Sequence, residues 1–318
     1  MSIRVALFGC GWIQDFHARG VRAHPDGELV AVANHREETA HAFAERHEIE
    51  RVTTDWRTLA ADPAVDAAIV ATPNALHAPQ AVELLRAGKH VLVEKPMATS
   101  VAECDAMIQA AAEGSASLMV AHCWRFHDDV RALGRRIEAG ELGEIVKTRG
   151  YGVHVDWGPS GWFVDRELAG GGALVDMGVH AIDTARFLLG DPVPERVCAA
   201  IGTRYAAGRY EVDDDGVVLI TWSNGTTSLV ECGWWQPHRG GPEADTEVYG
   251  TRGYDRVWPA EAPADDELGL QPMYSAQVGE FLDAVGEGRR PRPSGEDGRI
   301  VMQVVERAYA SALEAHAT

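Results

Sequence analysis

The sequence predicts an α/β protein with two domains, a doubly wound parallel sheet followed by an α/β domain with a mainly antiparallel sheet. The chain of 318 residues is long enough for two domains of ordinary size. Up to about residue 121, short apolar runs alternate with amphipathic stretches of helical length. Farther along, apolar residues recur at every second position, as in strands with one buried face.

The first domain is predicted from strands that are buried on both faces. Such strands read as continuous apolar runs, and helix-length spacers between them indicate a parallel sheet covered by helices. The runs lie at 5–8, 29–33, 67–71, 91–93 and 118–121, and the helical stretches at 39–47, 77–87 and 101–112. We therefore assign 1–121 to this domain.

The second domain, 122–318, is predicted from a change of rhythm. Helical patterns cover 128–139, which ends at Gly140, and 172–189, with a strand-like stretch over 144–155 between them. Strands are expected at 217–222, 226–234 and 246–252, and the turn at 223–225 makes the first two antiparallel. A proline-rich loop is expected at 260–266. Helices at 274–286 and 294–315 close the chain, the last with the option of packing back on the first domain.

Composition excludes several function classes. The 29 Lys and Arg against 48 Asp and Glu give a net charge of −19, which repels phosphate backbones and anionic lipid. We expect neither a nucleic-acid nor a membrane partner, since no apolar run reaches the roughly 18 residues of a membrane span. The apolar stretch before Gly9 is too short for a signal peptide, and the 5 cysteines form no Cys-x-x-Cys pair, which favours the cytoplasm. The spacing of His122, Cys123 and His127 matches no common zinc pattern, so no metal is expected.

A glycine loop follows the first predicted strand and opens a helix. It reads Gly9-Cys10-Gly11-Trp12-Ile13-Gln14. Gly9 is expected to make the tight turn, and Gly11, Trp12 and Ile13 to bring the helix N-terminus to a pyrophosphate. Gln14 replaces the third glycine of the dinucleotide pattern, so strand and helix are expected to pack less closely. The alternative is an ordinary strand-to-helix turn, but the place of the loop at the start of an alternating domain favours a nucleotide site.

The end of the second strand bears on the choice of cofactor. Asn34-His35-Arg36 lies where an acidic residue normally accepts the ribose 2′-hydroxyl of NAD. Asn34 is neutral, and an arginine such as Arg36 pairs with a 2′-phosphate that a carboxylate would repel. We therefore predict NADP(H) slightly favoured over NAD(H), because Asn34 can still bond the NAD ribose.

Two polar motifs follow the next buried strands. Thr72-Pro73-Asn74, with His77, comes after the third apolar run, and Glu94-Lys95-Pro96 after the fourth. Ligands of doubly wound sheets bind outside the carboxyl ends of the strands, so both motifs are expected at the cofactor. Lys95 is either a solvated loop lysine or a desolvated amine that exchanges a proton, and its position directly after a buried strand favours the second.

A third motif starts at the triple glycine 170–172 and continues as a helix. Asp176, His180 and Asp183 are spaced i, i+4, i+7 and share one face among apolar neighbours. Such a stripe is either a satisfied buried network or an active site, and the motif alone leaves both open. A dehydrogenase needs a hydride acceptor, for which nicotinamide serves, and a base near neutral pH, for which His180 is suited.

Together these motifs resemble the Gfo/Idh/MocA family of oxidoreductases, which includes glucose–fructose oxidoreductase and inositol dehydrogenase. The match takes in the glycine loop, 71–77, Glu94-Lys95-Pro96, 124–126, 142–145 and 170–183, in this order. The resemblance implies a Rossmann domain that binds NAD(P) and a substrate domain with a large open sheet, through which homodimers or homotetramers form. It implies Lys95, Asp176 and His180 as the catalytic set.

The resemblance also implies a sugar, polyol or inositol-like substrate near Trp124, Arg125 and Asp183. Trp162, Arg166, Trp234, Trp235 and His238 are further candidates for a sugar pocket, with core or interface roles as the alternative. Because Lys95 precedes residue 121 and Asp176 and His180 follow it, we expect the site where the domains meet. Competing functions are an NAD-dependent glycoside hydrolase or lyase, an imine or enone reductase, and a non-catalytic nucleotide sensor. The sensor is disfavoured by the three proton-handling residues.

Overall fold

The structure, a computed structural model, describes residues 2–155, 157–206, 208–236, 243–257 and 267–317. His238 and the loop predicted at 260–266 lie outside these residues. The chain divides into two compact units. The first comprises Met1–Ala98, Ala102–Cys123 and Asp266–Arg299, and the second Thr99–Val101, Trp124–Asp265 and Ile300–Thr318. Residues 266–299 thus group with the first unit although they follow the strands of the second.

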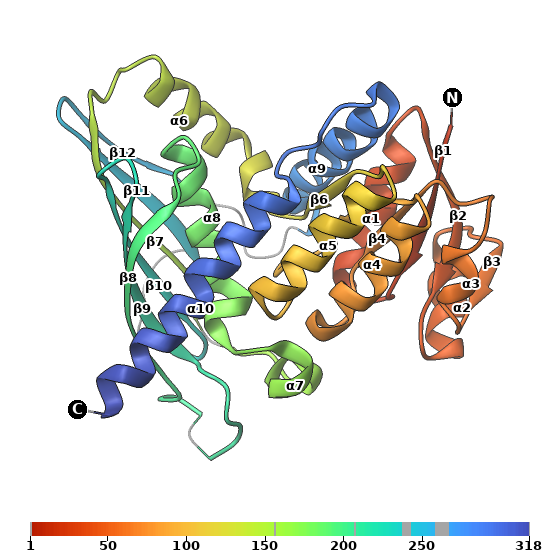
Figure 1. The fold of residues 1–318 in the computed structure, drawn as a ribbon, viewed down its shortest axis with the longest axis horizontal. Coiled ribbons are helices and arrows are strands. Elements are labelled where there is room, and N and C mark those ends of the chain that lie inside the picture. Colours follow the sequence, from red (N-terminus) through yellow and green to blue (C-terminus); the bar gives the residue numbers. More distant parts are fainter. Residues whose placement is uncertain (1, 156, 207, 237–242, 258–266, 318) are drawn as a thin grey trace. The chain divides into compact units, whose positions relative to one another are not determined.

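The sheet of the first unit is parallel. Its strands are β1 (Ile3–Phe8), β2 (Gly27–Ala33), β3 (Arg51–Thr53), β4 (Ala67–Val70), β5 (His90–Val93) and β6 (Leu118–Val120). They lie in the order β3-β2-β1-β4-β5-β6 (Figure 1). The order reverses between β1 and β4, which is where doubly wound sheets bind their ligands. The predicted Rossmann fold is confirmed.

Helices connect these strands. They are α1 (Trp12–Ala23), α2 (Glu37–Arg46), α3 (Arg57–Ala60), α4 (His77–Arg86) and α5 (Val101–Glu113). Two later elements also belong to this unit, namely α9 (Glu267–Glu287) and the first residues of α10 (Gly295–Ala317). Right-handed crossovers place α1 and α2 on one face of the sheet and α4 and α5 on the other. The α1 helix packs on α9, where Phe16 lies 5.0 Å from Tyr274 between ring centroids. Gly20 allows this approach, since a Cβ there would lie 3.0 Å from the side chain of Val278.

The second unit has a mixed sheet. Its strands are β7 (Ile145–Val153), β8 (Pro194–Gly202), β9 (Asp215–Trp222), β10 (Thr227–Gly233), β11 (Ala244–Gly250) and β12 (Tyr254–Val257), in the order β12-β11-β7-β10-β9-β8. Within this order β7 and β10 run parallel, and the other neighbours run antiparallel. The hairpin of β9 and β10 turns at Gly225, whose φ of 82° suits glycine. The predicted, mainly antiparallel sheet is confirmed.

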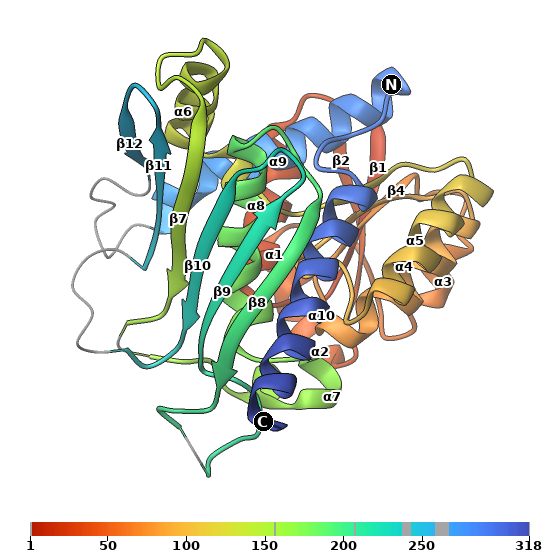
Figure 2. The ribbon, with the colours of Figure 1, turned by 60° about the vertical axis from the view of Figure 1, so that its left-hand side comes forward.

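A helical layer covers one face of this sheet. It includes α6 (Asp128–Glu138), the π-helix η4 (Leu174–Gly178) and α8 (Val179–Leu188), and the short helix α7 (Arg166–Ala169) precedes η4 in the chain. Gly152 of β7 lets η4 approach, because a Cβ there would lie 2.6 Å from the carbonyl oxygen of Met177. Leu133, Leu188 and Val248 belong to a buried cluster that joins α6, α8 and β11. Figure 2 shows the opposite face of β7, β10 and β9 without a helix over it.

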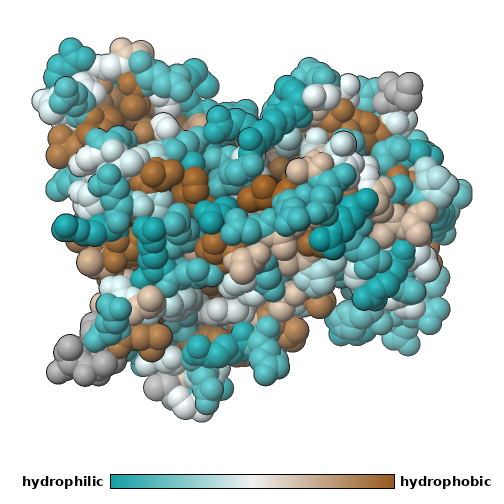
Figure 3. Space-filling model, viewed as in Figure 1, coloured by the Kyte–Doolittle hydropathy of each residue, from teal (hydrophilic) through white to brown (hydrophobic). Residues whose placement is uncertain are grey.

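Hydrophilic residues make up most of the face drawn in Figure 3, and apolar residues form small separate patches there. Among the described helices, none combines the length and the apolar character that a membrane span requires.

Candidate active site

The glycine loop leaves the N-terminus of α1 open. Gly9 has φ of 94°, and a Cβ there would lie 2.4 Å from the carbonyl oxygen of Ala71, so both conformation and space require glycine. Gly11 is the N-cap of α1 and makes no side-chain cap, and a Cβ on it would meet nothing within 4 Å. Gly11 thus leaves room beside the first turn of the helix, at Trp12 and Ile13, and a phosphate group suits such a helix N-terminus.

The two other positions of the loop are occupied by Gln14 and Cys10. Gln14 is fully buried, and its Nε2 donates a hydrogen bond of 3.3 Å to the carbonyl oxygen of Ile69 in β4. It thus takes the space that a third glycine would leave between helix and sheet. Burial raises the pKa of the Cys10 thiol to about 12, so this thiol stays protonated at neutral pH.

The segment 34–36 after β2 carries the cation of Arg36 and no carboxylate. The backbone N–H of Asn34 bonds the carbonyl of Thr53, and its Nδ2 donates to the carbonyl of Arg36 at 3.1 Å. His35 and Arg36 are exposed. Within the described part of the chain, the guanidinium of Arg36 makes no ion pair, and Glu37 and Glu38 follow it in the first turn of α2. Arg36 is therefore suited to attract a 2′-phosphate, and the carboxylates of Glu37 and Glu38 weaken that attraction.

His77 connects the loops that follow β4 and β5. Its Nε2 lies 2.8 Å from the carbonyl oxygen of Thr72, and its Nδ1 lies 2.9 Å from that of Pro96. The ring is buried, and burial lowers the pKa of His77 below its usual value despite these two carbonyls. A neutral imidazole has one N–H, so His77 donates to one of these carbonyls and packs against the other, between the loop of Pro73 and Asn74 and the loop of Lys95.

Glu94 anchors the backbone of Lys95. Its Oε2 accepts a hydrogen bond of 3.0 Å from the N–H of Lys95, and its Oε1 lies 2.8 Å from Nε2 of His17 in α1. Burial alone would raise the pKa of Glu94, but the hydrogen bond and charge of His17 hold it below its usual value. The ionised carboxylate thus ties the loop of Lys95 to the helix that begins at the glycine loop.

In the second unit, Asp213 fixes the triple glycine. Its carboxylate accepts hydrogen bonds from the N–H groups of Gly172 at 2.8 Å and Leu174 at 2.9 Å, and from the hydroxyl of Tyr309 at 2.6 Å. A Cβ on Gly172 would lie 1.8 Å from the carbonyl oxygen of Asp213, so the loop packs directly on this residue. The start of η4 is therefore set by one buried carboxylate.

Asp176 lies on η4 and His180 on the first turn of α8, and both side chains are buried. The Oδ2 atom of Asp176 accepts a hydrogen bond of 3.1 Å from Nε1 of Trp234 and lies 3.6 Å from Nε2 of His154. The predicted helix therefore exists, but its start is wound as a π-helix. Such turns often occur at functional sites because they change the direction of a side chain.

His180 and Asp183 are each held by a residue of the segment 123–126. The imidazole of His180 stacks on the indole of Trp124, with centroids 4.5 Å apart. Both carboxylate oxygens of Asp183 accept 2.7 Å hydrogen bonds from Arg125, and the two side chains are 1% and 5% exposed. Asp183 and Arg125 thus form a buried ion pair, and Arg125 also lies 2.9 Å from the carboxylate of Asp191.

The other candidates for a sugar pocket have separate surroundings. Trp162 is half-buried and stacks on Phe163 with centroids 3.9 Å apart. Arg166 donates to the carbonyl of Glu211 at 2.7 Å, and Trp235 has a guanidinium, that of Arg209, 5.9 Å from its ring.

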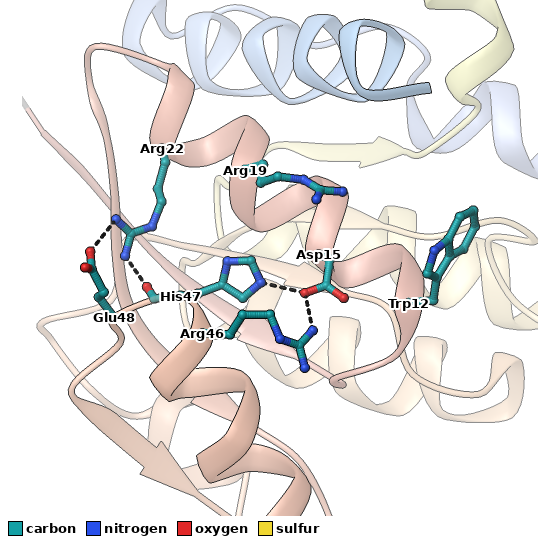
Figure 4. Close-up of a pocket in the computed structure, with 7 residues that line it drawn as sticks. All are labelled: Trp12, Asp15, Arg19, Arg22, Arg46, His47 and Glu48. Carbon is teal, nitrogen blue, oxygen red and sulfur yellow. Dashed lines mark hydrogen bonds and ion pairs between the residues drawn. The ribbon is translucent and has the colours of Figure 1, made fainter. Parts of the chain in front are cut away.

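A pocket of about 550 Å³ opens in the first unit between α1 and the end of α2 (Figure 4). Its charged groups pair with one another, since Asp15 bonds Arg46 at 2.7 Å and His47 at 2.6 Å, and Arg22 lies 3.2 Å from Glu48. Of the predicted cofactor residues, Trp12 lines it. The pocket is thus a polar surface groove beside the glycine loop.

Sequence reasoning missed His154, Glu243 and Asp213. His154 lies at the end of β7 with Glu243 3.1 Å from its Nδ1, a contact across 89 positions that no local pattern reveals. Asp213 had a visible signal, since it begins a run of three aspartates before a strand. No group of three potential metal-ligating side chains occurs among the residues with described positions.

Two family models match successive parts of the chain. Residues 3–122 match the oxidoreductase family with an NAD-binding Rossmann fold, and residues 130–254 match the GFO/IDH/MocA C-terminal domain. A 1,5-anhydro-D-fructose reductase of Ensifer adhaerens is 30% identical over 93% of this chain and 92% of its own. A D-xylose 1-dehydrogenase [NADP(+)] of Haloarcula marismortui is 30% identical over 96% of this chain and 90% of its own. A levoglucosan dehydrogenase in complex with NADH and levoglucosan superposes with a TM-score of 0.87 at 28% identity, covering 99% of this chain and 98% of the other. The chain belongs to the Gfo/Idh/MocA family of NAD-binding oxidoreductases.

Proposed function

We propose that this oxidoreductase transfers a hydride between nicotinamide and a secondary alcohol or ketone of a sugar, polyol or inositol-like substrate. The observation that carries the proposal is the pair Asp176 and His180, buried on consecutive helical turns and each oriented by a tryptophan. Similarity to a reductase and two dehydrogenases of sugars supports the substrate class.

For the cofactor, we propose the residues that surround the carboxyl ends of β1, β2, β4 and β5. The open N-terminus of α1, with Gly9, Gly11, Trp12 and Ile13, suits the pyrophosphate. Asn34, His35 and Arg36 suit the adenosine ribose, and Thr72, Pro73, Asn74, Glu94 and Lys95 the nicotinamide half. His77 contributes by holding the two loops together. When bound, the nicotinamide supplies the hydride acceptor or donor.

Arg36 supports a modest preference for NADP(H) over NAD(H). Its exposed guanidinium can pair with a 2′-phosphate, while Asn34 can bond the hydroxyl of an NAD ribose. The dehydrogenase of Haloarcula marismortui carries NADP(+) in its name, and the levoglucosan dehydrogenase structure contains NADH. The family thus includes both cofactors.

For the proton, we propose His180, Asp176 and Lys95. When the alcohol is oxidised, its carbon loses a hydride to the nicotinamide and its oxygen loses a proton. His180 or Lys95 accepts that proton, and the carboxylate of Asp176 stabilises the cation that forms. In the reverse direction the same group returns the proton to the alkoxide oxygen.

Around the substrate, we propose Trp124 and Trp162 as apolar surfaces. We propose that Arg125 and Asp183 contribute to the substrate site as a pair, because their charges are buried and bonded to each other. We further propose that 1–121 bind the cofactor and 122–318 the substrate, and that homodimers or homotetramers form through the uncovered sheet face. Val217 and Leu219 of β9 are 41% and 45% exposed, which supports an interface there. The five cysteines are free, which supports a cytoplasmic location.

The competing functions are an NAD-dependent glycoside hydrolase or lyase and a nucleotide sensor. The deciding experiment follows the absorbance of the reduced nicotinamide with both cofactors and a panel of sugars, inositols and their keto forms. Net cofactor reduction by an alcohol, or net oxidation by its ketone, is expected. Cleavage of an aryl glycoside without net change in the cofactor identifies a hydrolase, and binding without turnover identifies a sensor.

A further inference from the structure

A chain of alternating charges leads from Asp176 to the surface of the second unit. Nε2 of His154 lies 3.6 Å from Oδ2 of Asp176, and Nδ1 of the same ring lies 3.1 Å from Oε2 of Glu243. The first contact is too long for a good hydrogen bond and acts through charge, whereas the second has hydrogen-bond length. The imidazole thus stands between two carboxylates, one on each nitrogen.

The three side chains differ in their access to water. His154 and Asp176 are buried, whereas the side chain of Glu243 is 41% exposed. Trp157 stacks on the imidazole with centroids 3.6 Å apart, and its Nε1 donates to Oε1 of Glu243 at 3.0 Å. Trp234, which directly follows β10, donates to Asp176. The ring of His154 is therefore fixed on its face and at both nitrogens.

The charges around His154 favour its protonated form. The charged groups that act on it are Asp176 from η4 and Glu243 from the segment before β11, and the tryptophans that pack there are neutral. Burial alone would lower the pKa of His154, but its contacts with these two carboxylates raise it above the usual value. The pKa of Glu243 is held below its usual value because the bond to His154 outweighs burial.

We propose that His154, held as an imidazolium between Asp176 and Glu243, is a positioning residue that keeps Asp176 ionised and aimed for the proton-transfer step. The proposal rests on the proposed function in one respect, namely that Asp176 takes part in that step. Glu243 acts at a distance, since it touches His154 and not Asp176 in the described contacts.

The role has a chemical consequence. A buried carboxylate without a cation next to it tends to take up a proton, and a protonated Asp176 no longer stabilises a cation on a neighbouring base. The positive charge of His154 prevents this, and Glu243 helps to keep that charge, because it raises the pKa of His154 above its usual value. The first expected effect of losing Glu243 is therefore a change in the pH at which His154 titrates.

The direct test is an NMR titration of the His154 ring in the full chain without substrate. His154→Gln identifies its signal. We expect a midpoint above about 6.5 in the wild type. In Glu243→Gln the midpoint is expected to fall by about one pH unit, because one of two ion-pair partners is lost. Trp157→Phe, which removes one hydrogen bond to Glu243, is expected to give a smaller shift in the same direction. The control is Glu195→Gln, an exposed carboxylate of β8, with no shift expected.

Kinetics then test the coupling to Asp176. We expect Glu243→Gln to move the alkaline limb of kcat to lower pH, with a kcat near that of wild type on the acid side and little change in KM for the cofactor. Glu243→Asp, which keeps the charge, is expected to restore the limb. Thermal unfolding of each variant checks that it is folded.

Two results would overturn the proposal. One is a His154 midpoint at or below 6.5 in the wild type that Glu243→Gln leaves unchanged. The other is a shifted midpoint with a pH profile of kcat identical to that of wild type, which reduces His154 to a structural ion pair. The first result does not depend on the proposed function, since the titration needs no turnover, whereas the second requires a substrate that the enzyme turns over. If the titration gives the expected result but no dehydrogenase activity is found, the proposed function is wrong, and His154 then has no role in the proton-transfer step.

Discussion

The imidazole of His180 lies against the indole of Trp124, with ring centroids 4.5 Å apart and planes inclined by 14°. Trp124 comes from the segment Cys123–Phe126, whereas His180 stands on α8, so the contact joins two parts of the second unit that are more than 50 positions apart in the chain. The stacking limits the rotation of a group that we propose as a base.

Replacement of Trp124 tests this orientation. An aromatic contact contributes about 0.5–1.5 kcal/mol, so Trp124→Ala is expected to lower kcat roughly 2- to 10-fold if that energy is used to orient His180. Trp124→Phe keeps a stacking partner and is expected to retain most of the activity. Steady-state kinetics with saturating cofactor gives the comparison. Equal losses in both variants would mean that indole size, rather than stacking, matters.

Lys95 and His180 are expected to be needed for turnover but not for cofactor binding. Loss of a general acid or base typically costs about 10²- to 10⁴-fold in rate, and we expect this for Lys95→Ala and His180→Ala. Fluorescence titration with the reduced cofactor should give dissociation constants near that of wild type. Matched controls are the exposed Lys147→Ala and His41→Ala, which should keep full activity. Full activity in either test variant contradicts the assignment.

Arg36 is expected to set the cofactor preference. A hydrogen bond to a charged group contributes about 1.5–3 kcal/mol, so Arg36→Ala should raise KM for NADPH about 10-fold or more while KM for NADH changes little. The ratio of kcat/KM for the two cofactors measures this. A preference that stays the same in Arg36→Ala would mean that the guanidinium does not reach the 2′-phosphate.

Arg125 and Asp183 are expected to matter for stability. Removing one member of a buried ion pair typically costs about 3–5 kcal/mol, because the other charge is left behind in the interior. Arg125 also pairs with Asp191 at 2.9 Å, so Asp183→Asn should lower the free energy of unfolding by about the lower end of that range, as measured in urea. The pair Arg125→Met with Asp183→Leu should lose less than the sum of the single variants. Additive losses would argue against a coupled pair.

His77 makes the stability depend on pH. Burial lowers the pKa of His77 in the folded protein below 6.5, so below that pH the unfolded chain takes up a proton that the folded chain does not. The contribution of His77 to stability is therefore present at higher pH and falls as the pH drops through about 6.5. We expect the stability difference between wild type and His77→Gln to shrink between about pH 7.5 and 5.5. A difference that is constant over this range would contradict the account.

The sequence predicted the fold well where local patterns carry the information. The buried strands β1, β2, β4, β5 and β6 are continuous apolar runs, and each was found within a few residues. The short edge strands β3 and β12 and the α3 helix, of three or four residues each, were missed because so few positions show no periodicity. β8 was missed because proline and charged residues begin it, as is common in a strand at the edge of a sheet.

The candidate site was predictable only in part for a related reason. Gly9, Gly11 and the sequence around Asp176 and His180 carry local signals of turn and helix. The partners that orient them come from distant positions, such as Trp234 at Asp176 and Asp213 at the triple glycine. The π-helical winding of η4 also left no periodic trace, since it covers 5 residues.

The most direct test of the central claim follows the hydride itself. A sugar or polyol that reduces the cofactor is prepared with deuterium on the carbon that is oxidised, and the released cofactor is examined by mass spectrometry. We predict one deuterium in the reduced nicotinamide and a ketone as product, with both signals lost in His180→Ala. Formation of a product while the cofactor stays oxidised and free of deuterium would contradict the account.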